Sequence, residues 1–277
     1  MKVKMLSYTD LDTPIHRLTG ASKLLFFVLW SVSAMITYDT RVLVVMLLFS
    51  LFAFKISRVP FQQYAFVLYF ILAFFVLNHL AIFLFSPLEG VSIYGTRHDI
   101  FHIAGRYTVT WEQLFYQLNI ALKYAVVIPM ALLFLLTTDP SEFAASLNRI
   151  GVNYRIAYSV SLALRYIPDI QRDYENISFS AQARGIDTSR KEKLLTRLKN
   201  IGSILFPLIL TSVERIDKIS TAMELRGFGR GSKRTWYSLR PFTKSDYIVL
   251  ALIILVAIAS AVITFYDGSR FYNIFAE

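Results

Sequence analysis

The chain has 277 residues, of which 55% are hydrophobic, 15% aromatic and only 17% charged. Soluble domains carry roughly 25% charged residues, so this composition excludes an ordinary soluble protein and favours a lipid environment. The net charge is +10, but the basic residues cluster beside apolar runs, which is typical of membrane topology and argues against nucleic-acid binding. The chain contains no cysteine, which excludes disulfides and metal or iron–sulfur sites with cysteine ligands.

Five apolar runs predict membrane-spanning helices. The first two, residues 24–37 and 42–54, are short, because about 13 residues of helix reach only ~20 Å across a hydrocarbon core that is ~30 Å thick. They could form two short spans or a re-entrant pair. We predict two spans, since Asp39 and Arg41 between them would be costly in mid-bilayer. The other three runs are residues 61–85, 114–136 and 247–266.

The charge distribution predicts the orientation of these spans. Basic residues dominate the head of the chain, the 55–60 turn and the 138–246 stretch, whereas the 86–112 loop has slightly more acidic than basic residues. The positive-inside rule therefore places the N-terminus, the 55–60 turn and 138–246 in the cytoplasm, and the 86–112 loop and the C-terminus outside. The predicted organisation is a membrane region of four spans at 1–137, a cytoplasmic region at 138–246, and a last span with a short extracellular tail at 247–277.

The 138–246 region has the start and stop signals of helices. Asp139, Pro140 and Glu142 give an N-cap, a first-turn proline and an acidic third position, and Gly151 ends that helix. Two blocks of similar design follow, and each closes on Arg-Gly. Each block has a short apolar run with one proline, at 156–168 and 201–213, and then an amphipathic helix, at 169–184 and 214–226. The two closures are 42 residues apart, which is a weak internal repeat.

The two Arg-Gly closures place an arginine at the end of an apolar helix stripe. They consist of Ala183, Arg184 and Gly185, and of Leu225, Arg226 and Gly227. At 100° per residue, Arg184 continues the stripe of Ile170, Tyr174, Ile177 and Ala181, and Arg226 continues that of Ile216, Ile219 and Met223. Each glycine fits a left-handed residue that ends a helix. A single arginine there commonly only complements the helix dipole, but two copies on equivalent faces predict bidentate docking onto a partner with two equivalent sites.

Motifs for catalysis and metal binding are missing or weak. The sequence contains no P-loop, no His-Glu-x-x-His and no Gly-x-Ser-x-Gly, so it predicts no nucleotide, cofactor or catalytic site. His98 and His102 have i, i+4 spacing, which on a helix could ligate a metal, but they lie in the 86–112 loop without matching carboxylates. His79 and Lys123 are polar groups at membrane depth, for which contacts inside the bundle are expected.

Several motifs, in their order along the chain, resemble those of one known family. They are Asp12-Thr-Pro-Ile-His-Arg-Leu18 followed by Lys23-Leu-Leu25, Thr137-Thr-Asp-Pro-Ser-Glu142, Ser161-Leu-Ala-Leu-Arg-Tyr-Ile-Pro168, Ala183-Arg-Gly185 and Ala222-Met-Glu-Leu-Arg-Gly-Phe228. Over nearly its whole length, the chain is similar to the transmembrane (T) component of energy-coupling factor transporters, the EcfT/CbiQ family. The resemblance agrees with an all-α integral membrane protein that has about five transmembrane helices and long amphipathic cytoplasmic coupling helices.

The resemblance implies a non-catalytic subunit of an importer of the ABC class. Two cytoplasmic ATPase subunits, as a homo- or heterodimer, would each receive one Arg-Gly end in a groove, and ATP and magnesium would be bound by these partners. A membrane S component would bind the substrate, a vitamin or a transition-metal ion, and motion of the coupling helices would release it inward. The S component would slide on a platform of apolar side chains from both blocks: Leu162, Leu164, Ile167, Leu205, Phe206 and Leu208.

Two other classes of function remain as alternatives. A stand-alone secondary carrier would usually have inverted repeats and spans broken by glycine or proline, whereas the repeat here lies in the cytoplasmic region. An intramembrane enzyme would need convergent catalytic groups at bilayer depth, where the spans offer only His79 and Lys123 as obvious candidates. The sequence does not identify the cargo, because the family resemblance assigns its selection to the S component.

Overall fold

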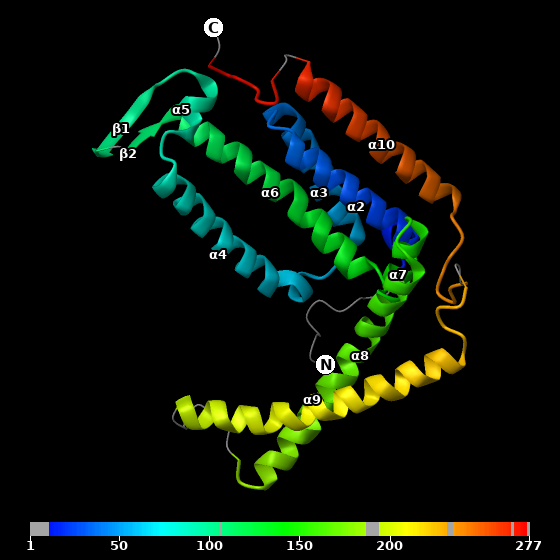
Figure 1. Ribbon diagram of the computed structural model, residues 1–277. Helices are drawn as coiled ribbons and strands as arrows, with labels where there is room; N and C mark the ends of the chain where they lie inside the picture. Colours follow the sequence, from blue (N-terminus) through cyan, green and yellow to red (C-terminus); the bar gives the residue numbers. More distant parts are fainter. Residues whose placement is uncertain (1–10, 106, 187–193, 232–234, 267–268, 276–277) are drawn as a thin grey trace. The chain divides into compact units, whose positions relative to one another are not determined.

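The computed structural model describes residues 11–105, 107–186, 194–231, 235–266 and 269–275 (Figure 1). These residues fall into two compact units. The first unit lies within Met1–Asp139 and Arg240–Glu277, and the second unit is Pro140–Leu239.

The first unit is a helical bundle with a small hairpin at one end. Its elements are α1 (Pro14–Arg17), α2 (Gly20–Ile36), α3 (Thr40–Ser57), α4 (Phe61–Phe85), α5 (Glu89–Tyr94), β1 (Asp99–Ala104), β2 (Tyr107–Thr110), α6 (Trp111–Thr137) and α10 (Lys244–Phe265). Among the described residues, α3, α4, α6 and α10 are long and apolar enough to cross a membrane, and α2 is a shorter apolar helix of 17 residues. The structure therefore confirms a mainly helical membrane protein.

Helices α2 and α3 are longer than the apolar runs from which they were predicted. They have 17 and 18 residues, which reach about 26 Å at ~1.5 Å per residue. The predicted lengths of these two helices, about 13 residues each, were too short because the helices extend into polar residues at their ends, whose hydrogen bonds are satisfied locally. Thr19 caps α2 through its side chain, and the Ser57 hydroxyl donates to the Phe54 carbonyl at 2.6 Å.

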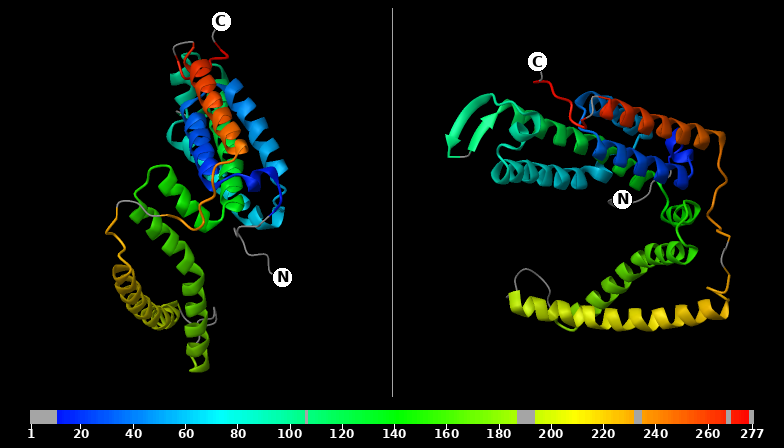
Figure 2. Two further views of the ribbon diagram at one scale, coloured as in Figure 1. Left: turned by 90° about the vertical axis from the view of Figure 1, so that its right-hand side faces the viewer. Right: turned by 45° about the horizontal axis from the view of Figure 1, so that its top comes forward.

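The core of the first unit lies where α2, α3, α6 and α10 pack side by side (Figures 1 and 2). Its buried side chains include Trp30, Leu43, Met46, Val126, Met130 and Ile253. The Trp30 indole N–H donates to the Val126 carbonyl at 3.3 Å and so joins α2 to α6. Helix α4 lies at the edge of the bundle, and none of its most apolar 18-residue window is buried. Such a helix is unfavourable in water and favourable in lipid.

The bundle contacts expected for His79 and Lys123 are present. Lys123 donates to the Met35 carbonyl at 2.8 Å and lies 3.1 Å from the ring centroid of Tyr38. One ring nitrogen of His79 lies 3.2 Å from the Gln117 carbonyl, and the Gln117 side-chain amide donates to the His79 carbonyl at 3.3 Å. These two polar positions inside the spans therefore have structural partners.

The helices of the bundle alternate in direction, so its loops gather at two opposite ends. At one end Asp246 accepts hydrogen bonds from the backbone N–H and the hydroxyl of Thr19, at 2.8 and 2.9 Å. At the other end the Tyr38 N–H donates to the Arg270 carbonyl at 3.0 Å, which ties the C-terminal segment to the α2–α3 turn. This alternation fits five crossings of a bilayer, and the assignment of each end to cytoplasm or exterior stays a prediction from charge.

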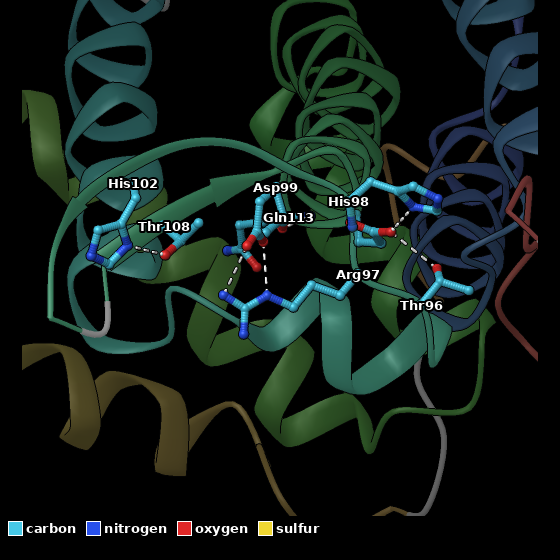
Figure 3. Close-up of polar contacts among 9 residues, drawn as sticks. Thr96, Arg97, His98, Asp99, His102, Thr108 and Gln113 are labelled. Atoms are coloured by element: carbon cyan, nitrogen blue, oxygen red, sulfur yellow. Dashed lines mark hydrogen bonds and ion pairs between the residues drawn. The ribbon is translucent and has the colours of Figure 1, made fainter.

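Residues 86–112, expected only as a polar loop, contain α5 and the antiparallel β1–β2 hairpin. Glu112 belongs to the first turn of α6, and its buried carboxylate accepts from the Thr96 hydroxyl at 3.0 Å and the His98 N–H at 3.1 Å (Figure 3). A Cβ added to Gly90 would lie 2.3 Å from the Glu112 carbonyl oxygen. Helix α5 therefore packs backbone to backbone against the start of α6. The hairpin adds two short strands to a chain that was predicted to be all helical.

The second unit consists of α7 (Pro140–Arg149), α8 (Tyr154–Ala183) and α9 (Leu194–Leu225). The start of α7 at Pro140 and the positive φ of Gly151, 105°, confirm the predicted first helix of this region. Helices α8 and α9 run unbroken for 30 and 32 residues, with Pro168 and Pro207 inside them. The prediction of a separate apolar run before each amphipathic helix was wrong. Both prolines are exposed, so each helix continues with the loss of one backbone hydrogen bond.

Candidate functional site

The two long helices of the second unit cross each other (Figures 1 and 2). Ile204 and Leu208 of α9 are buried, and a shallow groove between the helices is lined by Leu208 together with Ile170 and Tyr174 of α8. Arg215 Nη2 lies 2.5 Å from Asp173 Oδ2, which adds an ion pair between the helices. Both side chains are about one third exposed, so this pair contributes about 1 kcal/mol or less.

Helix α8 ends in a Schellman motif built on Gly185. The φ of Gly185 is 83°, a left-handed conformation that glycine adopts without steric cost. Its N–H donates to the Gln182 carbonyl at 2.9 Å, and the Ile186 N–H donates to the Ala181 carbonyl at 3.0 Å. These two bonds satisfy carbonyl groups that a helix end otherwise leaves unpaired.

Helix α9 ends in the same motif, built on Gly227. The φ of Gly227 is 67°. Its N–H donates to the Glu224 carbonyl at 2.9 Å, and the Phe228 N–H donates to the Met223 carbonyl at 2.9 Å. The predicted left-handed glycine at each closure is therefore confirmed, and the two Arg-Gly ends have the same backbone hydrogen bonds at equivalent positions.

Both arginines are exposed. Each apolar stripe also has an exposed member, with Ile170 at 40% and Ile216 at 58%, whereas Ala181 is buried. The residues that end the two helices, Ala183 and Leu225, are exposed, and so are Arg184 and Arg226 that follow them. Leu225 is 85% exposed. Arginine is among the residues enriched at protein interfaces and at their energetic hot spots. These six residues at 183–185 and 225–227 are therefore the candidate docking site, and the role of each stays a prediction.

The segment after α9 folds back onto the start of α8. The Phe228 ring lies 5.7 Å from the ring of Tyr154 and 4.9 Å from the ring of Tyr158, measured between centroids. The Arg155 guanidinium donates to the Gly229 carbonyl at 2.7 Å. These contacts were not predicted from the sequence, because the apolar residue after a helix-ending glycine commonly packs on its own helix, whereas Phe228 packs on α8.

The residues predicted as a platform differ in exposure. Phe206 is 66% exposed, Ile167 50% and Leu205 41%, whereas Leu162 and Leu164 are half-buried. Leu208 is only 8% exposed because it packs in the α8–α9 crossing. Five of the six side chains thus have exposed surface, and their use as a platform stays a prediction.

The two histidines of the 86–112 stretch lie apart and face different partners (Figure 3). His98 Nδ1 is 2.6 Å from Glu112 Oε1, whereas His102 lies on β1 and its Nδ1 is 2.8 Å from the Thr108 hydroxyl on β2. The helical spacing that could have joined them is therefore not realised. Within the described parts of the chain, no group of three or more His, Asp or Glu side chains is placed to hold a metal ion.

Comparison with known proteins gives one family. The CbiQ family, described as cobalt transport protein, matches residues 12–237. The energy-coupling factor transporter transmembrane protein EcfT of Bacillus selenitireducens is 30% identical over 269 residues, which cover 94% of this chain and 97% of that protein.

Two further relatives carry the same name. The protein of Lactococcus lactis subsp. cremoris is 27% identical and covers 91% of this chain and 94% of its own length. The protein of Bacillus subtilis is 27% identical and covers 88% and 92%. These matches, together with the apolar helices of the first unit, show that the chain is a multi-pass membrane protein that belongs to the CbiQ family of energy-coupling factor transporter T components.

Proposed function

We propose that this chain is the coupling subunit of an importer, and that each of its two Arg-Gly helix ends docks onto one cytoplasmic ABC-type ATPase subunit. The observation that carries the proposal is that α8 and α9 close in the same way, with an exposed arginine between the last helical residue and a left-handed glycine. Two ends with the same backbone closure suit a dimeric partner that offers one groove to each end. The ATPase pair is a homo- or heterodimer.

The chemistry of each end favours a groove that contains a carboxylate. A guanidinium group forms two parallel hydrogen bonds with a carboxylate, and its planar geometry makes the contact directional. The neighbouring apolar side chains, including Leu225, exclude water from that contact once the groove closes over them. Removing one partner of such a desolvated pair costs about 2–5 kcal/mol.

The helices that carry these ends are suited to transmitting motion. Arg184 and Arg226 each lie 11 residues beyond Asp173 and Arg215, the ion pair near the crossing, which is about 16 Å along a helix at ~1.5 Å per residue. A displacement of either end is therefore carried to the crossing through continuous helix. Nucleotide chemistry belongs to the ATPase partners, because the sequence has no P-loop, and we assign no cofactor to this chain.

The remaining assignments concern the membrane side. The S component would bind a vitamin or a transition-metal ion and rest on the exposed apolar side chains of α8 and α9, among them Ile167, Leu205 and Phe206. The N-terminus and the second unit would be cytoplasmic and the C-terminus extracellular, as the basic residues of 138–246 predict. The names of the relatives, which specify the transmembrane protein of an energy-coupling factor transporter, support a role within such a transporter.

Arginine substitutions test the proposal. Arg184→Ala and Arg226→Ala should each leave membrane insertion intact and weaken co-purification of the native ATPase subunits about 30-fold or more, and the double variant should abolish uptake. Arg172→Ala is the matched control, because Arg172 is also on α8 and its side chain is 77% exposed. Wild-type ATPase binding and uptake by the double variant would overturn the proposal.

Reconstitution separates the proposal from a stand-alone carrier. The purified chain in liposomes should transport no substrate by itself, whereas the chain with its co-purified ATPase subunits and S component should do so in the presence of ATP. Uptake by the chain alone would favour the secondary carrier instead.

A further inference from the structure

The end of α9 is fixed from both sides of Arg226. On the helix side, the Arg226 N–H donates to the Ala222 carbonyl at 3.2 Å. On the other side, Phe228 places its ring against Tyr154 and Tyr158 in the first turns of α8. Arg226 is thus separated from the aromatic contact only by Gly227.

Further contacts hold the fold-back segment in place. Arg155 donates to the Gly229 carbonyl at 2.7 Å, across 74 residues of sequence. The Trp236 indole N–H donates to the side-chain carbonyl of Asn148 on α7 at 3.0 Å, and the Trp236 ring lies 6.3 Å from the ring of Tyr158. Phe228, Gly229 and Trp236 therefore contact the end of α7 or the start of α8, and we call these contacts the aromatic clamp.

The corresponding position at the end of α8 has a different chemistry. Ile186 occupies the place that Phe228 occupies after α9, because each residue follows the helix-ending glycine and donates to the carbonyl five residues before it. Isoleucine has no ring and so cannot form the aromatic pairs that Phe228 forms. The two Arg-Gly ends share a backbone conformation but differ in this side chain.

We propose that Phe228, seated against Tyr154 and Tyr158, is a positioning residue that presets the direction of Arg226, so that the two ATPase-docking ends of this chain are not equivalent. The inference rests on the proposed docking of both ends. A preset end loses less conformational freedom on binding than an end that must be ordered. The ATPase subunit at α9 therefore depends on a ring two residues from the arginine that it binds.

Site-directed spin labels test the clamp without any partner. The chain has no cysteine, so one label can be placed by Ser180→Cys or by Ala222→Cys, which are exposed positions four residues before Arg184 and Arg226. In the full chain in lipid nanodiscs, Phe228→Ala should raise label mobility at 222 and leave it unchanged at 180. Phe228→Tyr keeps the ring and should restore the wild-type spectrum at 222. An unchanged spectrum at 222, or equal changes at both positions, would overturn the clamp.

Binding of the native ATPase subunits then tests the docking role. Phe228→Ala should weaken binding about tenfold, as two aromatic contacts of this kind imply, when Arg226 is present. In the Arg226→Ala variant it should add no further loss. Tyr237→Ala is the matched control, because Tyr237 lies in the same segment and its side chain is fully exposed.

The outcomes separate this inference from the proposed function. If neither arginine variant affects ATPase binding, the docking function fails, even where the labels show that the clamp exists. If the arginine variants act as expected but Phe228→Ala weakens binding equally in the Arg226→Ala background, the ring does not act through Arg226 and the positioning role is wrong. Phe228→Leu keeps an apolar side chain but no ring, so its loss of ATPase binding should lie between those of the wild type and Phe228→Ala. A loss as large as that of Phe228→Ala, together with poor folding, would indicate general misfolding and not a positioning role.

Discussion

Replacing Gly227 by alanine should weaken the end of α9, whereas the same change at Gly202 in the interior of α9 should strengthen the helix. A Cβ on Gly227 would meet only Arg230 Cδ, at an ordinary 3.6 Å, so the cost is one of backbone conformation. Gly227 has a φ of 67°, and the left-handed region costs a residue with a Cβ about 1–2 kcal/mol. A Cβ on Gly202 would meet nothing within 4 Å, so alanine there should gain about 0.5–1 kcal/mol.

The same cost applies at Gly185, where φ is 83° and a Cβ would meet nothing within 4 Å. Asparagine tolerates the left-handed region better than alanine does, so Gly227→Asn should recover most of the loss. The backbone conformation of each glycine sets the direction of the arginine before it. If forming that conformation costs about 1–2 kcal/mol more in the variant, ATPase binding at that end should weaken roughly 5- to 30-fold.

Hydrogen exchange measures the first step directly. The Gly227 and Phe228 N–H groups donate to the Glu224 and Met223 carbonyls, so Gly227→Ala should speed exchange in peptides that cover 222–228. Gly202→Ala should leave that exchange unchanged or slow it. The reasoning is refuted if both alanine variants shift exchange in the same direction, or if asparagine performs no better than alanine at Gly227.

Two further predictions concern the first unit. The buried carboxylate of Asp246 accepts two hydrogen bonds from each of Thr19 and Thr243. In Asp246→Asn an amide nitrogen would face a backbone N–H, so the purified chain should lose about 1–3 kcal/mol of stability in thermal unfolding. The same substitution at the exposed Asp12 is the control. Burial disfavours the charged form of Asp39, but the hydrogen bonds and charge of Arg41 outweigh it and hold the Asp39 pKa below its usual range. The ionised Asp39 carboxylate therefore stabilises the folded state at pH values above its unfolded pKa of about 4, and this stabilisation is lost as the pH falls through the folded pKa. Thermal unfolding measured from pH 7 to pH 3 should show a loss of stability on the acid side, and Asp39→Asn should reduce that loss.

The features that could be predicted from sequence are those whose causes lie within one or two helical turns. Apolar runs predict α4, α6 and α10 to within a few residues of their observed ends, because burial in lipid needs only an uninterrupted apolar segment. The Arg-Gly ends are equally local, since a glycine in the left-handed region and the carbonyl groups it caps lie within six residues of sequence.

The features that could not be predicted depend on partners far away in sequence. Pro168 and Pro207 signal helix breaks by local rules, but each lies inside a helix of 30 residues or more, whose remaining hydrogen bonds outweigh the one that proline removes. The β1–β2 hairpin lies beside Glu112, whose carboxylate accepts hydrogen bonds from residues 96 and 98. No periodicity in the 86–112 stretch indicates that contact.

The aromatic clamp and the Asp173–Arg215 pair together decide how α8 and α9 can move. Two helices in contact at one point can change their crossing angle, whereas two helices joined at two points keep that angle fixed. The ion pair joins the helices near their crossing, and Phe228 joins the end of α9 to the start of α8. While both contacts persist, Arg184 and Arg226 keep one spatial relation and a force on either end moves the two helices as one body. A change in their angle therefore requires at least one of the two contacts to break. The ion pair is partly exposed and weak, whereas the Phe228 contact is reinforced by the hydrogen bond from Arg155 to the Gly229 carbonyl.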